Sequence, residues 1–446
     1  MQLLCRKAFS GVTSCPQHLK QICKKILHAC QGLPLAIEVI GSVLSTRRQT
    51  MEDWELFYKS MGVEMERNNQ LVPIKKLLSL SYYDLPNHLK ICFLYLSIYP
   101  EDAKIRNDDL AKLWIAEGFV ERINETGKQG NIVVVRVHDI IRHIILLKAS
   151  EHNITTVFRG QEEISFSNNV KRLSVLGSIS GNSEQVQSSC KSIRTLVLHI
   201  IIGGNISESH LSHLLSHGRK LIKVLDFHDA QLERIPNEIF KLFQLKYKDL
   251  SRTKVKCVPK SIGMLQSLQT LNLLNTHVAE LPVEIQKLQQ LRHLIIGRFH
   301  SERVIETFEK VQGVRASLRI GKLKSLQQLM YTEADQVDNI SIVSEIGKLL
   351  QLRKLGITKL KTEDGKELCS SLVKLTELRE LIVYSVNEDE VIDFQYFSNI
   401  ELVRATGKMS RMDFFSSPTY KNRSPIRQVK RRPTGVPPQS DHSLPY

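Results

Sequence analysis

Leu268-Gln-Thr-Leu271-Asn-Leu273 is one of four segments that begin 23 residues apart along the chain. In this segment an aliphatic residue is followed three and five positions later by two more, and a Pro-containing turn with a second aliphatic stretch comes next. Alternation of this kind is typical of a short strand that turns its aliphatic side chains inward and the residues between them outward. The other three segments are Ile222-Lys-Val-Leu225-Asp-Phe227, Leu245-Lys-Tyr-Lys248-Asp-Leu250 and Leu291-Arg-His-Leu294-Ile-Ile296.

The same pattern recurs less regularly on both sides of these four segments, so that nine segments lie between Val170 and Val383. A period of this length indicates a leucine-rich-repeat solenoid, in which repeats stack because none can bury its own aliphatic face. We therefore expect an α/β fold overall, with a curved parallel sheet whose concave face offers a long binding surface. The five further segments begin at Val170, Ile193, Leu326, Leu352 and Leu378.

The residues between the inward aliphatic positions would carry any binding specificity, and we predict that they contact another protein. Lys248 breaks the pattern, because an ammonium occupies a position where the neighbouring repeats have Leu. This side chain must reach solvent or lose its charge, and we interpret it as a local weak point. The predicted partner-binding residues are Lys223, Asp226, Lys246, Tyr247, Asp249, Gln269, Asn272, Arg292 and His293.

Composition limits the class of protein. The chain has 446 residues, 42% of them hydrophobic, which allows two or three cores. No stretch reaches the roughly 18 uncharged apolar residues that a membrane span requires. The first residues lack the apolar stretch of a signal peptide, and the eight cysteines form no C-x-x-C pair. We therefore expect a cytoplasmic protein in a reducing compartment, with no membrane span.

Positive charge is concentrated at the end of the chain. The formal net charge is +16, and the last 43 residues supply +7, because nine Lys or Arg face only Asp413 and Asp441. Residues 401–446 have little aliphatic periodicity, which predicts a basic disordered tail. Lys430-Arg-Arg is compatible with a nuclear localisation patch and also with chance. The diffuse remaining charge suits a solvated surface as well as loose association with nucleic acid or an anionic membrane.

The first 150 residues are predicted to form helices followed by a short strand. Helical spacing over residues 16–45 is interrupted by Gly32-Leu33-Pro34-Leu35, which predicts two helices joined by a Pro-bearing corner. Asn107-Asp-Asp is expected to cap a helix over residues 110–117 that Gly118 ends. A Val-rich strand within residues 131–139 and an apolar helix from Ile140 then suit a winged-helix domain.

Four motifs occur here in a fixed order, and they resemble the later motifs of plant NB-ARC disease-resistance proteins, which are intracellular immune receptors with leucine-rich repeats. The Met-His-Asp motif of that family corresponds to Val137-His138-Asp139, with Val in the first place. The four motifs are Gly32-Leu33-Pro34-Leu35-Ala36, Leu78-Ser-Leu-Ser-Tyr82-Tyr-Asp84-Leu-Pro86, Cys92-Phe93-Leu94-Tyr95 through Tyr99-Pro100-Glu101-Asp102, and Leu113-Trp114-Ile115-Ala116-Glu117-Gly118-Phe119.

The resemblance implies four regions: a partial NB-ARC helical bundle over residues 1–75, a winged-helix domain over 76–150, leucine-rich repeats over 151–400 and the basic tail over 401–446. It also implies that the chain is truncated at its N-terminus, before the family's P-loop domain. Because the bundle of that family packs on the P-loop domain, we expect exposed apolar side chains among Leu3, Leu4, Phe9, Ile22 and Ile26.

In that family ADP, exchanged for ATP on activation, lies between the P-loop domain, the bundle and the winged helix. The resemblance implies that Pro34 borders the base and that His138 contacts the β-phosphate. The sequence has no G-x-x-x-x-G-K-[ST] phosphate cradle. One hydrogen bond from His138 is worth roughly 1.5 to 3 kcal/mol, whereas micromolar binding needs about 8 kcal/mol. We expect no tight ADP or ATP binding and no enzyme activity, and His138 also suits a structural role beside Asp139, an expected helix cap.

The favoured function is plant defence through protein recognition by the repeats, the partner being a pathogen effector, a guarded host protein or another receptor. Two alternatives stay open. The chain is an incomplete or decayed copy without independent activity, or its winged helix reads DNA through residues 110–119, although that apolar helix suits a core better than a major groove. No metal site is predicted, because the helically spaced His210, His213 and His217 lack a further ligand.

Overall fold

The computed structural model describes most of the bundle, the winged-helix region and the repeats. The residues that it describes are 1–9, 14–30, 34–62, 82–101, 103–120, 134–135, 137, 139–158, 171–176, 193–199, 211–212, 215, 221–299, 311–316, 319–334, 336–337, 340–387, 391–393, 402–406 and 408–410.

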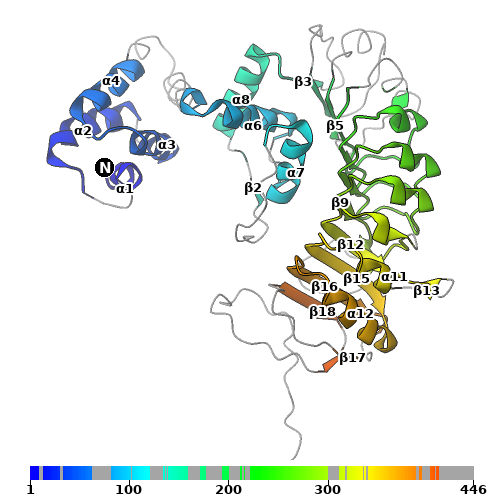
Figure 1. The fold of residues 1–446 in the computed structure, drawn as a ribbon. Coiled ribbons are helices and arrows are strands. Elements are labelled where there is room, and N and C mark those ends of the chain that lie inside the picture. Colours follow the sequence, from blue (N-terminus) through cyan, green and yellow to red (C-terminus); the bar gives the residue numbers. More distant parts are fainter. Residues whose placement is uncertain are drawn as a thin grey trace, which may run out of the picture.

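The N-terminal elements form a helical bundle with its own apolar core (Figure 1). Its elements are α1 (Gln2–Ala8), the 3-10 helix η1 (Gln17–Leu19), α2 (Lys20–Ala29), α3 (Pro34–Ser45) and α4 (Met51–Gly62). Pro34 is the first residue of α3, where the missing N–H leaves no helical hydrogen bond unmade. The predicted pair of helices with a Pro-bearing corner is therefore confirmed.

The bundle buries the apolar side chains that we expected to be exposed. Leu4, Phe9, Ile22 and Ile26 belong to its core, and only Leu3 is partly buried at its edge. The expectation was wrong for these four residues because α1 packs against α3 and α2 packs against α4, so each helix covers the apolar face of another.

The region from Asn87 to Glu151 has the order of elements expected of a winged helix. It contains α6 (Asn87–Tyr95), η2 (Leu96–Ile98), β1 (Ile105–Arg106), α7 (Asn107–Glu117), β2 (Val134–Val135) and α8 (Asp139–Glu151), and β1 pairs with β2 in antiparallel fashion.

α7 differs in its start from the expected helix. It begins at Asn107 rather than Leu110, its N-cap is Arg106, and no side chain caps it. Asp108 and Asp109 lie instead inside the first turn, where carboxylates interact favourably with the positive end of the helix dipole. Gly118 ends the helix with a φ of 84°, as expected of a left-handed C-cap.

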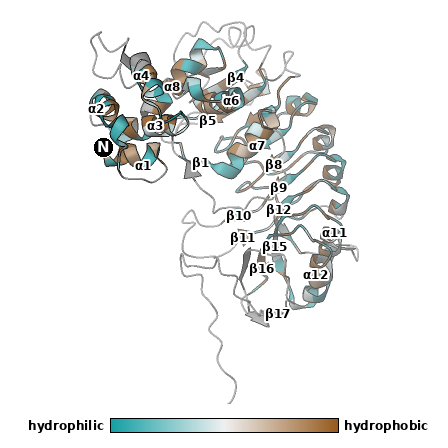
Figure 2. Ribbon diagram, turned by 60° about the vertical axis from the view of Figure 1, so that its left-hand side comes forward, coloured by the Kyte–Doolittle hydropathy of each residue, from teal (hydrophilic) through white to brown (hydrophobic). Residues whose placement is uncertain are grey.

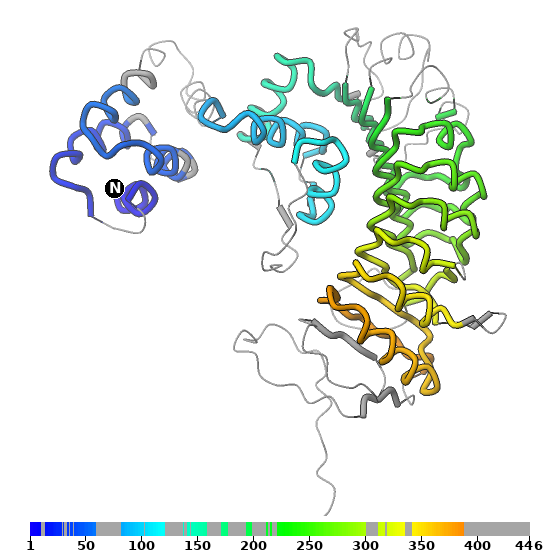
Figure 3. Tube along the Cα trace, in the orientation of Figure 1, coloured from blue at the N-terminus to red at the C-terminus, as the bar shows by residue number. Residues whose placement is uncertain are grey.

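The repeats form an 11-stranded sheet in which all neighbouring strands are parallel (Figures 1 and 3). The nine predicted segments correspond to nine of these strands, flanked by β3 and β18. The strands are β3 (Thr155–Phe158), β4 (Arg172–Leu176), β5 (Thr195–His199), β6 (Val224–Asp226), β7 (Tyr247–Asp249), β8 (Thr270–Asn272), β9 (His293–Ile295), β12 (Gln328–Glu333), β15 (Lys354–Leu360), β16 (Glu380–Ser385) and β18 (Leu402–Thr406).

The convex side consists of short helices, and in three repeats a proline, Pro236, Pro259 or Pro282, directly precedes the 3-10 turn. Figure 2 shows polar and apolar residues alternating through the stacked repeats, as expected of turns with one buried face. The helices are η3 (Asn237–Lys241), η4 (Lys260–Met264), η5 (Val283–Lys287), η6 (Ile320–Lys322), α11 (Ile342–Ile346), η7 (Thr362–Asp364) and α12 (Gly365–Leu372).

Besides β1 with β2, three further small strand pairs lie outside the large sheet in the described part of the chain. They are β10 (Arg298–Phe299) with β11 (Val311–Gln312), β13 (Gln336–Val337) with β14 (Ile340–Ser341), and β17 (Val391–Asp393) with β19 (Lys408–Ser410). Because β18 and β19 follow residue 400, the boundary expected there between repeats and tail is about one strand too early. Residues 411–446 of the expected tail lie outside the described part.

Lys248 lies in the core of the solenoid with 0% of its surface exposed. Among the described residues its Nζ has no hydrogen-bond partner, and it lies 5.5 Å from the centroid of the Phe227 ring. Burial lowers the pKa of Lys248 from 10.5 to about 7, with the charge of Asp249 acting in the opposite direction. Of the two outcomes expected for this side chain, loss of charge is the one that its burial favours.

Replacing Lys248 with Met should stabilise the solenoid, because Met fills similar space without a buried amine. The lowered pKa corresponds to a penalty of at most about 5 kcal/mol at pH values below 7. Between pH about 7 and about 10 the unfolded chain binds more protons at this site than the folded chain, so the penalty falls as pH rises. Urea denaturation near pH 6 should therefore show that Lys248→Met is much more stable than the unsubstituted protein. Near pH 9.5 the difference in stability between the two proteins should be smaller.

Lys254→Met is the matched control, because Lys254 is an exposed lysine of the same repeat. This variant should leave the urea midpoint nearly unchanged at both pH values. Equal midpoints for Lys248→Met and the unsubstituted protein near pH 6 would show that Lys248 is not a weak point.

Candidate recognition surface on the concave face

The outward residues of the strands form rows, because the parallel register places the same repeat position of neighbouring strands side by side. We call the row formed by Thr195, Val224, Tyr247, Thr270, His293, Gln328, Lys354 and Glu380 the first row. The second row lies two residues further along each strand and consists of Val197, Asp226, Asp249, Asn272, Ile295 and Met330.

A basic row lies directly before the first row, at the residue that follows the first aliphatic position of each repeat. Each of its members donates its backbone N–H to the backbone carbonyl of the member before it, at N to O distances of 2.7–2.9 Å. Its members are Lys171, Arg194, Lys223, Lys246, Gln269, Arg292, Gln327, Arg353 and Arg379.

Helix α7 covers part of the first row. Its residues Leu110, Leu113 and Ala116 share one buried cluster with Val224 and Tyr247 of the sheet. The apolar face of α7 is thus buried by the solenoid, which agrees with the expectation that this face suits a core rather than a DNA groove. The winged-helix region and the repeats form a continuous packed contact.

A buried ion pair anchors the C-terminal end of α7. Glu117 accepts a hydrogen bond from Arg172 Nε of β4 at 2.9 Å, and the hydroxyl of Thr195 also donates to it. The Glu117 and Arg172 side chains are only 1% and 6% exposed. The Arg172 guanidinium lies 4.8 Å from the centroid of the Phe119 ring. Because both charges are paired and hydrogen-bonded, this contact avoids the cost of an isolated buried charge.

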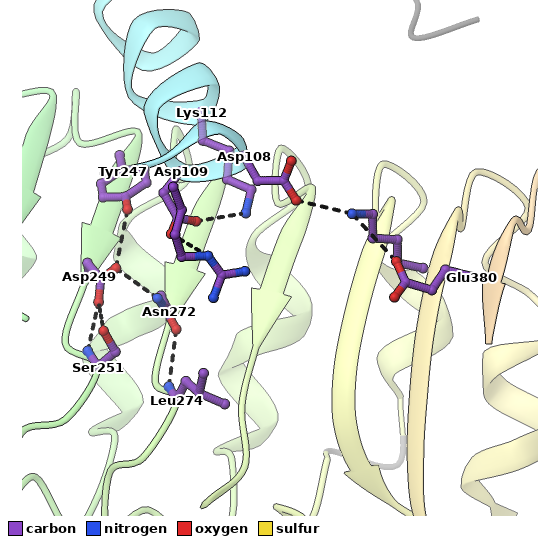
Figure 4. A network of polar contacts seen from close by, with 11 residues as sticks. Asp108, Asp109, Lys112, Tyr247, Asp249, Ser251, Asn272, Leu274 and Glu380 are labelled. Atoms are coloured by element: carbon purple, nitrogen blue, oxygen red, sulfur yellow. Dashed lines mark hydrogen bonds and ion pairs between the residues drawn. The ribbon is translucent and has the colours of Figure 1, made fainter. Parts of the chain in front are cut away.

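The N-terminal end of α7 reaches later repeats through ion pairs. Lys354 Nζ lies 3.3 Å from Asp108 and 3.6 Å from Glu380, so one lysine of the first row bridges the helix and the next strand. Asp109 pairs with Lys112 at 3.3 Å within the helix. Figure 4 shows these α7 side chains beside Tyr247 and the second row.

Three members of the second row turn the chain after their strands. Side-chain oxygens of Asp226, Asp249 and Asn272 each accept from the backbone N–H two residues later, at 3.1, 2.7 and 3.1 Å. Asn272 also donates to Asp249 at 2.7 Å. These are side-chain turns of the kind that Asp and Asn favour, so the three residues have a structural role in the described chain.

Burial shifts the pKa values of several side chains on this part of the concave face. It raises the pKa of Tyr247 well above its ordinary value and that of Asp249 to about 6, with Asp226 adding to the second shift. The carboxylate of Asp226, 2.9 Å from the His228 ring, raises the pKa of His228 to about 10. Burial and the charges of Lys112, Arg292 and Lys354 hold the pKa of His293 well below its usual range. The imidazole of His293 is therefore neutral at pH 7.

The predicted partner-binding residues divide into two groups. Asp226, Tyr247, Asp249, Gln269 and Asn272 are buried, whereas Lys223, Lys246, Arg292 and His293 keep partial exposure. Tyr247 shares a buried cluster with residues of α7. Sequence reasoning missed Arg172 and Glu117, although an Arg inside a strand and a Glu in an apolar helix were visible signals. His210, His213 and His217 lie outside the described residues. Among the residues that the structure describes, no group of three or more His, Cys, Asp or Glu side chains could hold a metal ion.

Of the two residues expected to contact a nucleotide, the structure describes only Pro34. Pro34 is exposed and, as a proline, has no N–H to donate. His138 lies outside the described residues. A cavity beside Val137, lined also by Tyr99, Ile105 and Arg142, has room for about one water molecule.

The comparisons with known proteins agree with this fold. The family model of a leucine-rich repeat region matches residues 201–429. Disease resistance protein Pik-2 of Oryza sativa subsp. japonica is 33% identical over 265 residues, covering 53% of this chain and 25% of its own length. Disease resistance protein RPM1 of Arabidopsis thaliana is 29% identical over 269 residues, covering 54% of this chain and 28% of its own.

Two solved structures are similar to part of this chain at low TM-scores. Internalin C2 of Listeria monocytogenes has a TM-score of 0.35 at 18% identity and covers 49% of this chain and 84% of its own. A TDR receptor structure has a TM-score of 0.37 at 18% identity, with 54% and 43% covered. The chain spans about a quarter of the length of the curated relatives named above. The chain belongs to the leucine-rich repeat proteins, and its curated relatives are plant disease-resistance proteins.

Proposed function

We propose that this chain is the repeat-bearing part of a plant immune receptor and acts by binding another protein through its leucine-rich repeats. The observation that carries the proposal is the concave face, where the basic row, whose Lys and Arg side chains are exposed or partly exposed, runs beside the first row, which α7 partly covers. The relatives support a role in disease resistance. Among the described residues no helix is long and apolar enough to cross a membrane, and we propose the cytoplasm, with the nucleus as an alternative, as its location.

The charge of the basic row indicates the charge of the partner surface that would bind it. Seven of its nine members are Lys or Arg, and they follow one another at the strand spacing of about 4.8 Å. Lys171 and Arg194 are exposed, and Lys223 and Arg353 are partly exposed. Like charges so close together repel one another, and an acidic protein surface would relieve the repulsion along the whole row. We therefore propose an acidic partner surface.

Because α7 packs on the concave face, binding of a partner to this face would also affect the winged-helix region and the rest of the receptor. A partner on the basic row would lie beside the first row, where Tyr247 and Lys354 already contact α7. Competition or cooperation between partner and helix would change how firmly the winged-helix region is held. Such a coupling requires that the partner bind with different affinity when α7 is docked on the sheet and when α7 is released from it.

The packing of α7 weighs against DNA reading, because Leu110 and Leu113 are enclosed by the solenoid rather than free to enter a groove.

For nucleotides, we propose that the chain has no useful affinity for ADP, and no hydrolase activity follows from its described side chains. In the described part of the chain, the Lys248 amine favours a decayed copy over a functional receptor, since a core amine without a hydrogen-bond partner lowers stability.

Charge reversal on the basic row should abolish capture of a specific partner. Arg194→Glu combined with Arg353→Glu removes two cations and adds two anions, which costs about 1 kcal/mol or more for each contact and lowers recovery roughly tenfold or more. Quantitative proximity labelling in plant tissue measures recovery. The matched control is Lys241→Glu with Lys374→Glu, which makes the same charge change at exposed convex positions.

A partner of the concave face is a protein that the first variant loses and the convex variant retains. Equal recovery of every labelled protein by both variants would exclude the basic row as the recognition surface. Recovered nucleic acid in place of protein, with the same loss, would exclude a protein partner.

Removing the buried ion pair should release α7. Arg172→Met leaves Glu117 buried without its partner, which costs about 3 kcal/mol and should speed amide exchange in α7 roughly 100-fold. Hydrogen exchange followed by mass spectrometry measures this rate. The double variant Arg172→Met with Glu117→Leu should recover most of the protection, because no charge is left unpaired.

Lys361→Ala is the control, because the Lys361–Glu363 pair is exposed at 55% and 71%. This variant should leave exchange in α7 unchanged. Unchanged protection in Arg172→Met would mean that the ion pair does not hold the helix.

Calorimetry with ADP and with ATP tests the nucleotide proposal on the purified chain. No saturable heat in the micromolar range is expected, because the phosphate cradle is not in this sequence and Pro34 is exposed. Saturable micromolar binding that weakens in His138→Ala would instead establish a working nucleotide contact at His138.

A further inference from the structure

Three cysteines of the helical bundle converge at one point, although they come from different elements. Cys5 lies in α1, Cys15 lies just before η1, and Cys23 lies in α2. The Sγ atoms of Cys15 and Cys23 are 3.2 Å apart. Burial, followed by the neighbouring Cys15, raises the pKa of the Cys5 thiol. Cys15 is therefore the central thiol of the three.

We propose that Cys15 and Cys23 form a redox-active dithiol, which a peroxide converts reversibly into an intramolecular disulfide. A disulfide bond is about 2.05 Å long, so the two sulfur atoms need to approach by only about 1.2 Å. Rotation of the Cys15 side chain can supply this movement, because Cys15 belongs to an irregular segment rather than to a helix. The inference is independent of the function proposed for the repeats.

Accessibility assigns different roles to the two sulfur atoms. Cys23 is 0% exposed, whereas Cys15 keeps partial exposure, so a dissolved peroxide reaches Cys15 first. Burial, followed by the contact with Cys15, raises the pKa of the Cys23 thiol. A thiol of this kind is a poor first nucleophile, which leaves Cys23 as the resolving thiol.

The reaction balances in two steps. The sulfur of Cys15, as its thiolate, attacks hydrogen peroxide; an S–O bond forms, the O–O bond breaks, and one water is released after proton transfer. The sulfur of Cys23 then attacks the sulfenic acid; the S–S bond forms, the S–O bond breaks, and the hydroxyl leaves as a second water with the Cys23 proton. A dithiol such as dithiothreitol returns two electrons and two protons and restores both thiols.

The geometry favours a disulfide over the other chemistry of clustered cysteines. Within the described ranges no three His, Cys, Asp or Glu side chains are arranged to hold a metal ion. The bridge would join the segment before η1 to α2. In a reducing compartment such bridges are transient and report oxidation, which makes the dithiol a modification site rather than a permanent staple.

The test uses the full chain, reduced, desalted and treated with stoichiometric hydrogen peroxide. Remaining thiols are blocked with N-ethylmaleimide, and a tryptic digest is analysed by mass spectrometry. Lys20 separates the two cysteines, so cleavage after Lys7, Lys20 and Lys24 places them on residues 8–20 and 21–24. We expect a disulfide-linked pair of these peptides, whose mass is the sum of the two peptide masses less two hydrogens. Reduction with dithiothreitol should separate the pair.

Cys15→Ser and Cys23→Ser should each abolish the linked pair. Cys30→Ser is the matched control, because Cys30 is a buried cysteine of the same core whose pKa is raised, to about 11, by burial without a neighbouring thiol. This variant should form the bridge as the unsubstituted chain does. Circular dichroism of each reduced variant establishes that the bundle is folded.

Three results would overturn the assignment. One is oxidation confined to the exposed Cys257, with intermolecular dimers. Another is over-oxidation of Cys15 to the sulfinic acid with no linked peptide. The third is a link from Cys15 to Cys5, which would make α1 rather than α2 the bridged helix.

Discussion

The structure depends on the stacking of aliphatic side chains between neighbouring repeats. A single repeat has no core of its own, and Leu294 is buried because the strands on its two sides bring Leu271 and Leu329 into register with it. This constraint explains why the sheet is parallel throughout and why the repeats share one continuous cluster. It also explains why one amine at Lys248 matters, since its register partners, Leu225 and Leu271, are apolar.

The same register that builds the core also organises the surface. Residues at one repeat position become neighbours at about 4.8 Å, so a preference for Lys or Arg at that position becomes the basic row, which Gln269 and Gln327 interrupt. Likewise, Asp or Asn at another position becomes a series of side-chain turns that end the strands. A repeat sequence thus specifies rows rather than isolated residues, and a partner would meet a charged stripe along the solenoid.

Buried polar groups in this chain show two contrasting outcomes. Glu117 is enclosed with Arg172 and Thr195, so its charge is matched and hydrogen-bonded, and the pair orients α7 on the sheet. Lys248 is enclosed with an aromatic ring and no hydrogen-bond partner in the described chain, so its burial opposes the charged form. The difference lies in whether a second element supplies the matching group.

The sequence by itself determined the repeat period, nine repeat strands and their inward aliphatic positions, and the two helices joined by the Pro-bearing corner, because these follow from spacing within a few residues. It did not show that α7 covers Val224 and Tyr247, that Asp108 reaches Lys354, or that Cys15 meets Cys23. It also placed the start of α7 and the end of the sheet imperfectly, since neither is marked by a change of period. Only the tertiary structure decided which outward residues stay exposed, because that depends on contacts between segments far apart in the chain, which local periodicity does not encode.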